Sequence, residues 1–359
     1  MALHFHTLTI ADVKKETEDC ISIALAVPEN LKDIFQFTHG QNITLKTNIN
    51  GEEIRRSYSI CSAPFDGELR VAVKKVMGGK FSIFANEKLK KGDTIEVLAP
   101  SGKFNTALSG QNKKNYLAIA AGSGITPILS IIKTTLATES ESTFTLIFGN
   151  RSRSSIIFFE ALEAIKNKYL QRFNFINILS REKIEASINF GRINTEKLID
   201  LKKVINYKNI HEAFICGPEE MIFSAKDFLL QEGMDIKNIH FELFTTPGIK
   251  KMTEDSGERI EKSAGLVSKI ILKLDGRSID FNLGFNGNSI LDEALQQGAD
   301  LPYACKGGVC STCRAKLLEG KVEMDVNYAL EPGEVAQGFI LTCQAHPVTE
   351  KVVVDFDVR

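Results

Sequence analysis

The sequence predicts a multidomain protein with an antiparallel β-barrel at residues 1–110, an α/β domain with a parallel sheet at 111–246, and a further domain at 266–359. Three observations lead to this prediction. They are a run of short β-rich segments, a change to alternating strands and helices, and a polar stretch at 247–265 that has no periodic apolar face. A chain of 359 residues is long enough for two or three compact domains.

The first domain is predicted from short segments separated by Gly, Asn, Asp or Pro: CISIALAV, QNITLKTNI, IRRSYSIC, ELRVAVKKV and DTIEVLAP. Leu69, Val71 and Val73 recur at every second position, which is typical of a strand with one buried face. Segments of this kind predict an antiparallel barrel, with one short helix near residues 81–89.

The second domain is predicted from four segments that each precede a helical pattern: YLAIAA, TFTLIF, FNFINIL and HEAFIC. After the first of them, Ile128, Ile131, Ile132 and Leu136 have the spacing of one helix face. Strands that alternate with helices predict a parallel sheet wrapped by helices.

The third domain begins with a strong hairpin signal after the polar stretch, which we interpret as a linker. Asp275 and Gly276 separate two strand patterns and favour the positive backbone angles of a tight turn. A short helix is expected next, with Ser289 as its N-cap and Asp292 completing a capping box.

Four cysteines of this domain have the spacing C-x4-C-x2-C-x29-C: Cys305, Cys310, Cys313 and Cys343. This spacing is typical of a plant-type [2Fe-2S] cluster. Gly307 and Gly308 allow the backbone to curl around such a cluster. The alternatives are a zinc site and incidental buried thiols, but zinc usually takes paired C-x2-C knuckles and only one such pair is present.

A chain that uses both a nicotinamide nucleotide and such a cluster needs a flavin, because hydride carries two electrons and the cluster accepts one. Two stretches of the first domain are candidates. The segment RRSYS supplies Arg56 for a pyrophosphate, Tyr58 for stacking on the flavin and Ser59 for a hydrogen bond near its N5. Ser57, which lies between them, is a further cofactor-binding candidate. The second stretch is a turn before the short helix, which offers free N–H groups to the FAD pyrophosphate: Gly79, Lys80, Phe81 and Ser82. The alternatives are a plain strand and an ordinary turn.

The second domain carries a candidate nucleotide-binding turn directly after its first strand: Gly122, Gly124, Ile125, Thr126 and Pro127. Pro127 stands where the usual fingerprint has a third glycine. The next strand ends in FGNRSR, where NAD-binding folds usually carry an acidic residue. Arg151 and Arg153 therefore predict a 2′-phosphate site and a preference for NADPH, with two solvated arginines as the alternative.

Two further groups lie at strand ends of this domain. Cys216, Gly217 and Pro218 precede a helix that contains Met221, and such edges bind ligands in open parallel sheets. Cys216 is expected to touch the nicotinamide, or else to be a structural thiol. Later, HFELF carries two further catalytic candidates, of which the second is expected either to cover the flavin or to be a core residue: Glu242 and Phe244. Together with Cys216 and with Ser59 of the first domain, these two residues are the candidates for catalysis. The run from Gly191 to Asn194 has no functional interpretation, and a helix start is its simplest explanation.

The composition excludes several function classes. A hydrophobic share of 43%, a charged share of 25% and a net charge of −1 argue against a nucleic-acid or membrane-surface partner. No apolar run is long enough for a membrane span, and the N-terminus lacks a secretory pattern, so we expect a cytoplasmic protein. The remaining cysteines, Cys20 and Cys61, are expected to be small buried hydrophobes.

Taken together, RSYS, GGKFS, AAGSGITP, FGNRSR, CGPEEM and the cysteine set resemble the ferredoxin-NADP reductase superfamily fused to a plant-type ferredoxin. The resemblance covers essentially the whole chain. It implies a β-grasp fold for the third domain, and FAD, NADPH and a [2Fe-2S] cluster as cofactors on the residues named above.

Two C-terminal runs, LPYACKGGVCSTCRAKLLEGKVEMD and GFILTCQAHP, are similar to the reductase subunits of phenylacetyl-CoA epoxidases. In that family the reductase supplies electrons to a separate di-iron oxygenase component, so the resemblance implies an oxygenase partner. Two alternatives remain open. One is a reductase for a ring-hydroxylating dioxygenase or another monooxygenase, and the other is a redox sensor that uses the flavin and the cluster.

Overall fold

The computed structural model describes residues 4–183, 186–244 and 266–358. These residues form two compact units, of which the first comprises residues 5–244 and the second contains the described C-terminal residues. The linker expected at 247–265 lies outside the described residues. The exact domain boundaries stay a prediction.

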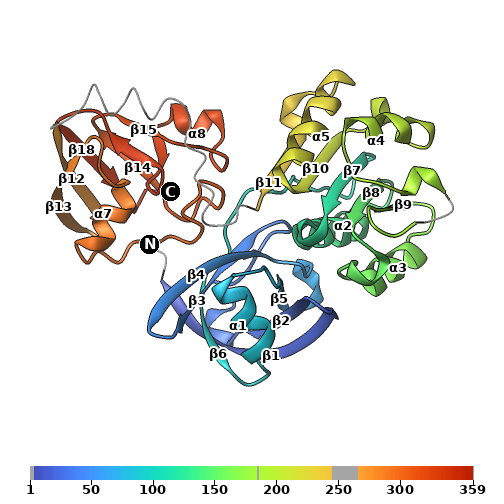
Figure 1. The fold of residues 1–359 in the computed structure, drawn as a ribbon, viewed down its shortest axis with the longest axis horizontal. Helices are drawn as coiled ribbons and strands as arrows, with labels where there is room; N and C mark the ends of the chain where they lie inside the picture. The colour runs from blue at the N-terminus through green and yellow to red at the C-terminus, as the bar shows by residue number, and fades with distance from the viewer. Residues whose placement is uncertain (1–3, 184–185, 245–265, 359) are drawn as a thin grey trace. The chain divides into compact units, whose positions relative to one another are not determined.

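The first unit begins with a six-stranded antiparallel sheet (Figure 1). Its strands are β1 (Phe5–Thr17), β2 (Cys20–Ala26), β3 (Asn42–Ile49), β4 (Glu52–Ser59), β5 (Leu69–Lys74) and β6 (Thr94–Leu98). Their order across the sheet is β4-β3-β6-β1-β2-β5. An isolated bridge between Ile60 and Val71 links the end of β4 to β5, so the sheet closes into the predicted barrel.

The barrel is filled by the side chains that the period-two pattern predicts to be buried. Leu69, Val71 and Val73 of β5 are almost completely buried. The expected short helix is α1 (Lys80–Lys88), and it inserts Phe81 into the same core. Each such side chain contributes about 1.5–3 kcal/mol to folding through the hydrophobic effect. The barrel is therefore a rigid support for the side chains on β4.

The first unit continues with a five-stranded parallel sheet that has helices on both faces (Figure 1). Its strands are β7 (Asn115–Ala121), β8 (Thr143–Asn150), β9 (Phe173–Leu179), β10 (Glu212–Gly217) and β11 (Ile239–Leu243), and its helices are α2 (Ile125–Thr138), α3 (Phe159–Lys168), α4 (Thr195–Asp200) and α5 (Glu219–Gln231). The sheet order is β11-β10-β7-β8-β9. The chain therefore changes direction across the sheet between β7 and β10, and ligands of open parallel sheets bind at the carboxyl ends beside such a point.

The barrel and the parallel sheet are held together within this unit. The hydroxyl of Ser130 on α2 donates a hydrogen bond of 2.7 Å to the carbonyl oxygen of Ser62, and Lys133 of the same helix forms an ion pair with Asp66. Cys61 of the barrel belongs to the apolar core beneath α2. These contacts fix the end of β4 relative to the carboxyl edge of the parallel sheet.

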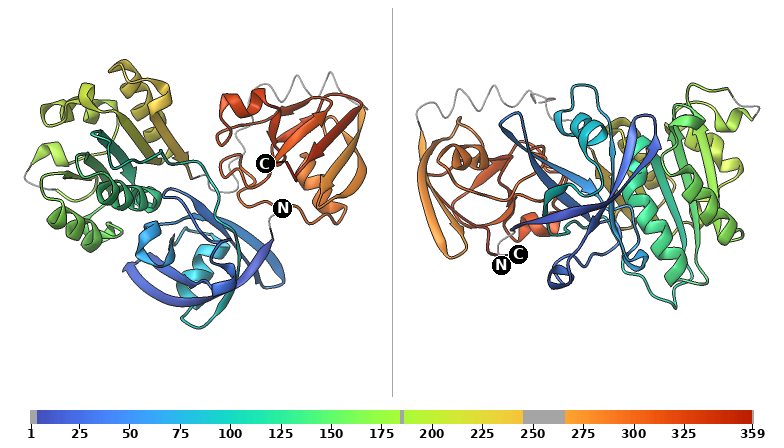
Figure 2. Two further views of the ribbon diagram at one scale, coloured as in Figure 1. Left: turned by 180° about the vertical axis from the view of Figure 1, so that it is seen from behind. Right: turned by 90° about the horizontal axis from the view of Figure 1, so that it is seen from below.

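The second unit is built on a mixed five-stranded sheet of order β13-β12-β18-β14-β16, with a separate two-stranded sheet of β15 and β17. Its elements are β12 (Val267–Leu274), β13 (Arg277–Gly284), α7 (Ile290–Gln296), β14 (Arg314–Glu319), β15 (Val322–Met324), α8 (Pro332–Ala336), β16 (Phe339–Leu341), β17 (Ala345–Pro347) and β18 (Lys351–Asp355). Figure 2 shows the three large sheets from two further directions, each with its own helices. The predicted fold class is confirmed: the barrel domain has an antiparallel sheet, the α/β domain a parallel sheet, and the domain expected to be a β-grasp a mixed sheet.

Two local predictions for the second unit are also confirmed. Asp275 and Gly276 have positive φ angles of 52° and 68° and connect β12 to β13 in a tight hairpin. The hydroxyl of Ser289 accepts a hydrogen bond of 3.2 Å from the backbone N–H of Asp292 and so caps α7. Among the residues that the structure describes, no helix is both long enough and apolar enough to cross a membrane.

Candidate functional site

A cavity of about 710 Å³ opens at the carboxyl edge of the parallel sheet. Six residues predicted to bind nucleotide or flavin line it: Gly122, Arg151, Gly217, Pro218, Met221 and Phe244. They come from the ends of β7, β8, β10 and β11 and from α5, which meet at this edge because the strands are parallel. The structure therefore brings residues that are up to 122 positions apart in the sequence to one site.

The turn after β7 packs closely against the end of β10. Gly122 adopts a positive φ of 54°. A Cβ atom on Gly124 would lie only 2.1 Å from the carbonyl oxygen of Cys216, so this position requires glycine. The other members of the predicted turn are buried in the first turn of α2: Ile125, Thr126 and Pro127. They shape the turn, whereas Gly122 and Ser123 face the cavity.

Three of the four predicted catalytic residues lie together where the barrel meets the parallel sheet. The hydroxyl of Ser59, at the end of β4, donates a hydrogen bond of 3.0 Å to a carboxylate oxygen of Glu242 on β11. Cys216 is the register partner of Glu242 on the neighbouring strand. Burial raises the pKa of the Cys216 thiol well above its ordinary value, and the Glu242 carboxylate raises that pKa further. Cys216 is therefore a neutral thiol near neutral pH.

Cys216 and Phe244 differ in exposure. Cys216 is fully buried and is not among the residues that line the cavity, so its contact with a nicotinamide stays a prediction. Phe244, the fourth predicted catalytic residue, is 41% exposed and lines the cavity. A core role for Phe244 therefore does not fit its position, whereas a ring that covers a bound cofactor does.

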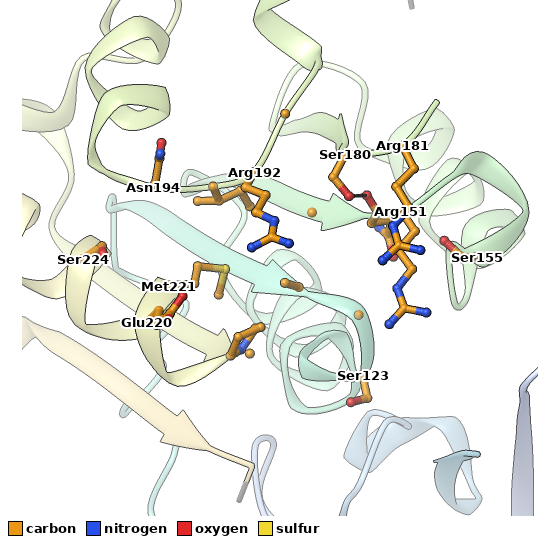
Figure 3. Close-up of a pocket in the computed structure, with 18 of the residues that line it drawn as sticks. Ser123, Arg151, Ser155, Ser180, Arg181, Arg192, Asn194, Glu220, Met221 and Ser224 are labelled. Atoms are coloured by element: carbon orange, nitrogen blue, oxygen red, sulfur yellow. Dashed lines mark hydrogen bonds between the residues drawn. The ribbon is translucent and has the colours of Figure 1, made fainter. Parts of the chain in front are cut away.

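The cavity is rich in positive charge. Arg151, Arg181 and Arg192 line it together with Lys74 of β5. Figure 3 shows Arg151 and Arg181 side by side at one end of the cavity, with Arg192 between them and Met221. The backbone N–H of Arg181 donates to the carbonyl oxygen of Arg151, which keeps these two residues adjacent. This grouping suits an anionic ligand with more than one phosphate group.

Asn150 adds an unsatisfied donor to the same cavity. Its side chain is only 7% exposed, and its amide nitrogen has no hydrogen-bond partner within the part of the chain that the structure describes. Buried amide groups are normally hydrogen-bonded, and a bare one costs about 1–3 kcal/mol.

Arg153 lies differently from Arg151. Its guanidinium stacks over the ring of Phe159 at 5.0 Å, and its backbone N–H donates to the carboxylate of Glu182. Arg153 is not among the residues that line the cavity. Its role in binding a 2′-phosphate stays a prediction.

Sequence reasoning missed three basic residues of the cavity: Lys74, Arg181 and Arg192. Arg181 could have been found, because it follows β9 and the carboxyl ends of parallel strands share one edge. Arg192 belongs to the run from Gly191 to Asn194, whose last residue caps α4 by accepting a hydrogen bond of 2.9 Å from the N–H of Lys197. That run therefore opens a helix, as expected, and also faces the cavity.

The predicted flavin residues lie together on β4 and α1. The rings of Tyr58 and Phe81 are 5.4 Å apart, so the buried Phe81 supports Tyr58. Burial raises the pKa of Tyr58, whose phenol therefore stays neutral. Arg56, two residues before Tyr58 on the strand, donates a hydrogen bond of 2.7 Å to the carbonyl oxygen of Arg55.

The turn before α1 is closed by its own side chains. The hydroxyl of Ser82 donates to the carbonyl oxygen of Gly79 at 3.2 Å and accepts from the N–H of Val76 at 3.1 Å. Lys80 forms an ion pair with Glu52 of β4. An aromatic ring, an arginine and the N-terminus of a nine-residue helix on neighbouring elements fit the ring and the pyrophosphate of FAD. Ser57 instead contacts Thr44 across the β3–β4 pair, at 3.1 Å between the hydroxyl oxygens.

The four cysteines of the second unit converge in two pairs. A hydrogen bond from the Cys305 thiol lowers the pKa of Cys310, and one from the Cys313 thiol lowers the pKa of Cys343. Within the described ranges, no three or more His, Cys, Asp or Glu side chains gather tightly enough to hold a single metal ion. Two thiol pairs match the ligand set of a cluster of two irons, each of which takes two protein ligands.

The backbone of the cysteine loop is curled as the glycines predict. Lys306, Gly308 and Ser311 have positive φ angles of 52°, 73° and 50°. The N–H of Gly307 donates to the sulfur of Cys305 at 3.3 Å. Cys305 is the only one of the four that is partly exposed, and the other three are buried. The loop therefore combines mostly buried thiols with an N–H donor to sulfur, which fits the surroundings that a [2Fe-2S] cluster needs.

Comparison with known protein families divides the chain in the same way. Residues 7–106 match an oxidoreductase FAD-binding domain, residues 118–227 match an oxidoreductase NAD-binding domain, and residues 272–348 match a 2Fe-2S iron-sulfur cluster binding domain. The three sheets of the structure thus correspond to a flavin, a nicotinamide and a cluster domain.

Full-length relatives have the same three-part arrangement. The chain is 48% identical to a subunit of the 1,2-phenylacetyl-CoA epoxidase of Escherichia coli (strain K12), over 99% of this chain and 98% of that protein. It is 32% identical to the ferredoxin reductase component of 3-ketosteroid-9-alpha-monooxygenase of Rhodococcus rhodochrous, over 97% and 96% of the two chains.

Solved structures agree on the fold. Phthalate dioxygenase reductase matches with a TM-score of 0.58 and 22% identity, over 98% of each chain. A ferredoxin NADP+ reductase from Neisseria gonorrhoeae matches 66% of this chain and 98% of its own length, with a TM-score of 0.56 and 24% identity. On the full-length identities, the chain belongs to the family of oxygenase reductase components that join a ferredoxin-NADP reductase-type flavoprotein to a [2Fe-2S] domain.

Proposed function

We propose that this oxidoreductase takes hydride from NADPH in preference to NADH, and that its electron acceptor is the oxygenase component of a phenylacetyl-CoA epoxidase. The observation that carries the nucleotide preference is the grouping of Arg151, Arg181 and Arg192 around one cavity. NAD-binding folds usually place a carboxylate for the ribose 2′-hydroxyl after the second strand, and here Asn150 is followed by Arg151. Arginine at that place favours a 2′-phosphate.

FAD is proposed to lie against β4 and α1. Tyr58 would stack on its ring, while Arg56 and the Gly79–Ser82 turn would hold its pyrophosphate. When bound, FAD would accept the electron pair of hydride, and a cluster held by the four cysteines would pass electrons on singly. The protein itself would bind the flavin and the cluster, orient them and exclude water from them.

Ser59, Cys216 and Glu242 are proposed to position the nicotinamide and the flavin. Glu242 accepts the hydrogen bond of Ser59 and so fixes the serine hydroxyl at the junction of barrel and sheet. The neutral thiol of Cys216 offers a small apolar surface beside them. Orientation of this kind accelerates a reaction because reacting atoms must approach to about 3–3.5 Å. Phe244 would cover the flavin until a nicotinamide displaces its ring.

The acceptor is proposed from the 48% identity to the Escherichia coli epoxidase protein, which exceeds the 32% identity to the ketosteroid monooxygenase component. The residues of the cavity and of the cysteine loop are assigned to the nucleotide and the cluster, and none is assigned to an oxygenase substrate. The electron-transfer chemistry and the acceptor are therefore tested separately.

The first experiment mixes the purified holoprotein with NADPH or NADH without oxygen and records flavin bleaching and the electron paramagnetic resonance signal of the cluster. We expect both signals, with an apparent affinity for NADPH at least tenfold higher than for NADH. Equal affinities would overturn the NADPH preference, and a reduced flavin beside a silent cluster would overturn the proposed electron route.

The second experiment adds the purified oxygenase component of a phenylacetyl-CoA epoxidase and measures NADPH- and phenylacetyl-CoA-dependent product formation. The oxygenase component of a ring-hydroxylating dioxygenase serves as the control acceptor. Turnover with the epoxidase component and not with the dioxygenase component would support the proposal. Turnover only with the dioxygenase would assign the reductase to that class of oxygenase, and failure to turn over any acceptor, cytochrome c included, would favour a redox sensor.

A further inference from the structure

The side chain of Gln344, which follows the fourth cysteine, is buried against the cysteine loop. It is only 9% exposed. Its amide nitrogen lies 3.0 Å from the carbonyl oxygen of Lys306, 2.9 Å from the carbonyl oxygen of Cys343 and 3.6 Å from the sulfur of Cys343. One side-chain amide thus joins the first part of the loop to the cysteine that is distant in sequence.

The surroundings fix the orientation of this amide. Two carbonyl oxygens face its nitrogen, and a flipped amide would set its own oxygen against both of them. The Cβ position that Gly308 leaves empty lies 3.2 Å from Cγ of Gln344, so the side chain has little room to move away. The amide nitrogen therefore points at the loop and at the sulfur. Since it carries two hydrogens and faces three acceptors, one N–H is shared between the carbonyl oxygen and the sulfur of Cys343.

We propose that Gln344 is a positioning residue for the [2Fe-2S] cluster. Its side chain anchors the loop at Lys306 and raises the reduction potential of the cluster by donating a hydrogen bond to the sulfur of Cys343. The inference rests on the proposed assignment of the four cysteines as cluster ligands. Because the donor belongs to a side chain outside the run from Cys305 to Cys313, a substitution can remove it without replacing any residue of the loop itself.

The anchoring role follows from the backbone of Lys306. This residue has a φ of 52°, in the left-handed region that non-glycine residues seldom adopt. The hydrogen bond from Gln344 to its carbonyl oxygen stabilises that conformation. The direction of the Lys306 peptide in turn sets the place of Cys305, the preceding ligand.

The electronic role follows from charge. A reduced cluster carries one more negative charge than an oxidised one, and part of it resides on the sulfur ligands. A donor N–H stabilises the more negative state more strongly, so hydrogen bonds to the sulfurs raise the potential. Replacing the donor with an apolar group of similar size should therefore favour the oxidised cluster.

The test compares Gln344→Met with Gln337→Met in the holoprotein. Methionine keeps the length of glutamine without an N–H donor, and Gln337 is an exposed glutamine of the same unit. We expect Gln344→Met to shift the reduction equilibrium about tenfold toward the oxidised cluster, which corresponds to about 59 mV for one electron. Gln337→Met should match the wild type. An unchanged potential in Gln344→Met with full iron content would overturn the proposal.

A second measurement needs no variant. Wild-type protein labelled with ¹⁵N at the glutamine side-chain amide should show a nitrogen hyperfine coupling to the reduced cluster in pulsed electron paramagnetic resonance. Absence of that coupling would overturn the hydrogen bond to sulfur even if Gln344→Met fails to fold. If Gln344→Met loses iron while the wild type and Gln337→Met keep it, the anchoring role is supported. Wild-type protein without iron would instead refute the cluster assignment itself.

Discussion

The cysteine loop and the nucleotide cavity assemble their polar groups in opposite ways. The loop draws three of its four thiols from the nine residues between Cys305 and Cys313. The cavity draws its arginines from the end of β8, from the residues after β9 and from the run before α4. The first site comes mostly from one continuous piece of chain, to which the distant Cys343 is added, and the second site is built along the edge of a sheet.

This difference determines how each site should respond to substitution. In the loop, each sulfur is proposed to be a direct ligand, so we expect one change to remove the site and to leave the remainder of the chain intact. In the cavity, the parallel sheet holds the arginines in place, so a change in strand packing should affect all of them together. A substitution of one arginine should affect only the contact which that arginine makes. The following predictions test that contrast.

Cys313→Ser should have the largest effect. A serine hydroxyl does not replace a thiolate ligand of the cluster, so we expect loss of the cluster and of electron transfer to cytochrome c. Reduction of the flavin by NADPH should stay within about twofold of the wild-type rate, because that site lies in the other unit. Iron and sulfide content and stopped-flow absorbance measure the two effects. Cys20→Ala is the control, and a full cluster in Cys313→Ser would contradict the ligand assignment.

Gly124→Ala should damage the whole nucleotide cavity. The added Cβ would lie 2.1 Å from the carbonyl oxygen of Cys216, and both groups belong to backbone that is packed in place. Overpacking of this kind costs about 1–3 kcal/mol of folding free energy, and we expect the upper end. Thermal unfolding and nucleotide titration measure the result.

The matched control is Gly110→Ala, since a Cβ there would meet only the carbonyl oxygen of Thr138 at 3.7 Å. If both variants bound NADPH and unfolded like the wild type, the close approach of the β7 turn to β10 would not be what shapes the cavity.

Ser59→Ala should slow flavin reduction by about 100-fold, the size of effect that a small misplacement of reacting groups produces. The substitution removes the hydrogen bond to Glu242, which links the barrel to β11. Ser57→Ala is the control, because Ser57 contacts Thr44 within the barrel instead. Stopped-flow reduction at saturating NADPH separates a change in rate from a change in affinity. Equal rates in the two variants would refute the positioning role of Ser59.

The contrast also explains what the sequence could predict. The cysteine spacing, the Asp275–Gly276 turn and the Ser289 cap are local signals, and the structure contains the predicted turn and cap. Gly122 and Arg151 were found because they follow the first two strands of the parallel sheet. Such residues can be assigned from neighbours in the sequence alone.

Residues that reach a site through tertiary packing could not be assigned in this way. Lys74 belongs to β5 of the barrel and faces the cavity only because the barrel docks on the parallel sheet. Arg192 reaches the cavity through a loop that leads into α4. Gln344 looks like an ordinary polar residue in sequence, and only its distances to Lys306 and Cys343 distinguish it.

Arg181→Gln should weaken NADPH binding by about tenfold and leave NADH binding nearly unchanged. A hydrogen bond to a charged group contributes about 1.5–3 kcal/mol, and the lower value applies because Arg181 is exposed to solvent. Arg153→Gln, whose guanidinium stacks on Phe159, should have a smaller effect. Titration of both variants with both nucleotides measures the contributions. A larger loss in Arg153→Gln would place the 2′-phosphate beside Arg153 and away from the cavity arginines.

The smallest effect should come from Glu212, at the opposite end of β10 from the cavity. Burial would raise the pKa of this carboxyl, but hydrogen bonds from His240, Lys114 and Thr106 outweigh burial and lower the pKa to about 2. An unfolded glutamate has a pKa of about 4.3. The ionised carboxylate therefore stabilises the folded state fully above about pH 5, and this contribution is lost as the pH falls toward 2.

After allowance for solvent screening, we expect Glu212→Gln to lower the free energy of unfolding by about 1–2 kcal/mol at pH 7. About half of that difference should disappear at pH 3, because the wild-type carboxylate then loses its advantage over the neutral amide. Urea unfolding followed by far-UV circular dichroism at both pH values measures it, with the exposed Glu141→Gln as the control. A difference that stays constant between pH 7 and pH 3 would show that packing around Glu212, and not its charge, stabilises this end of the sheet.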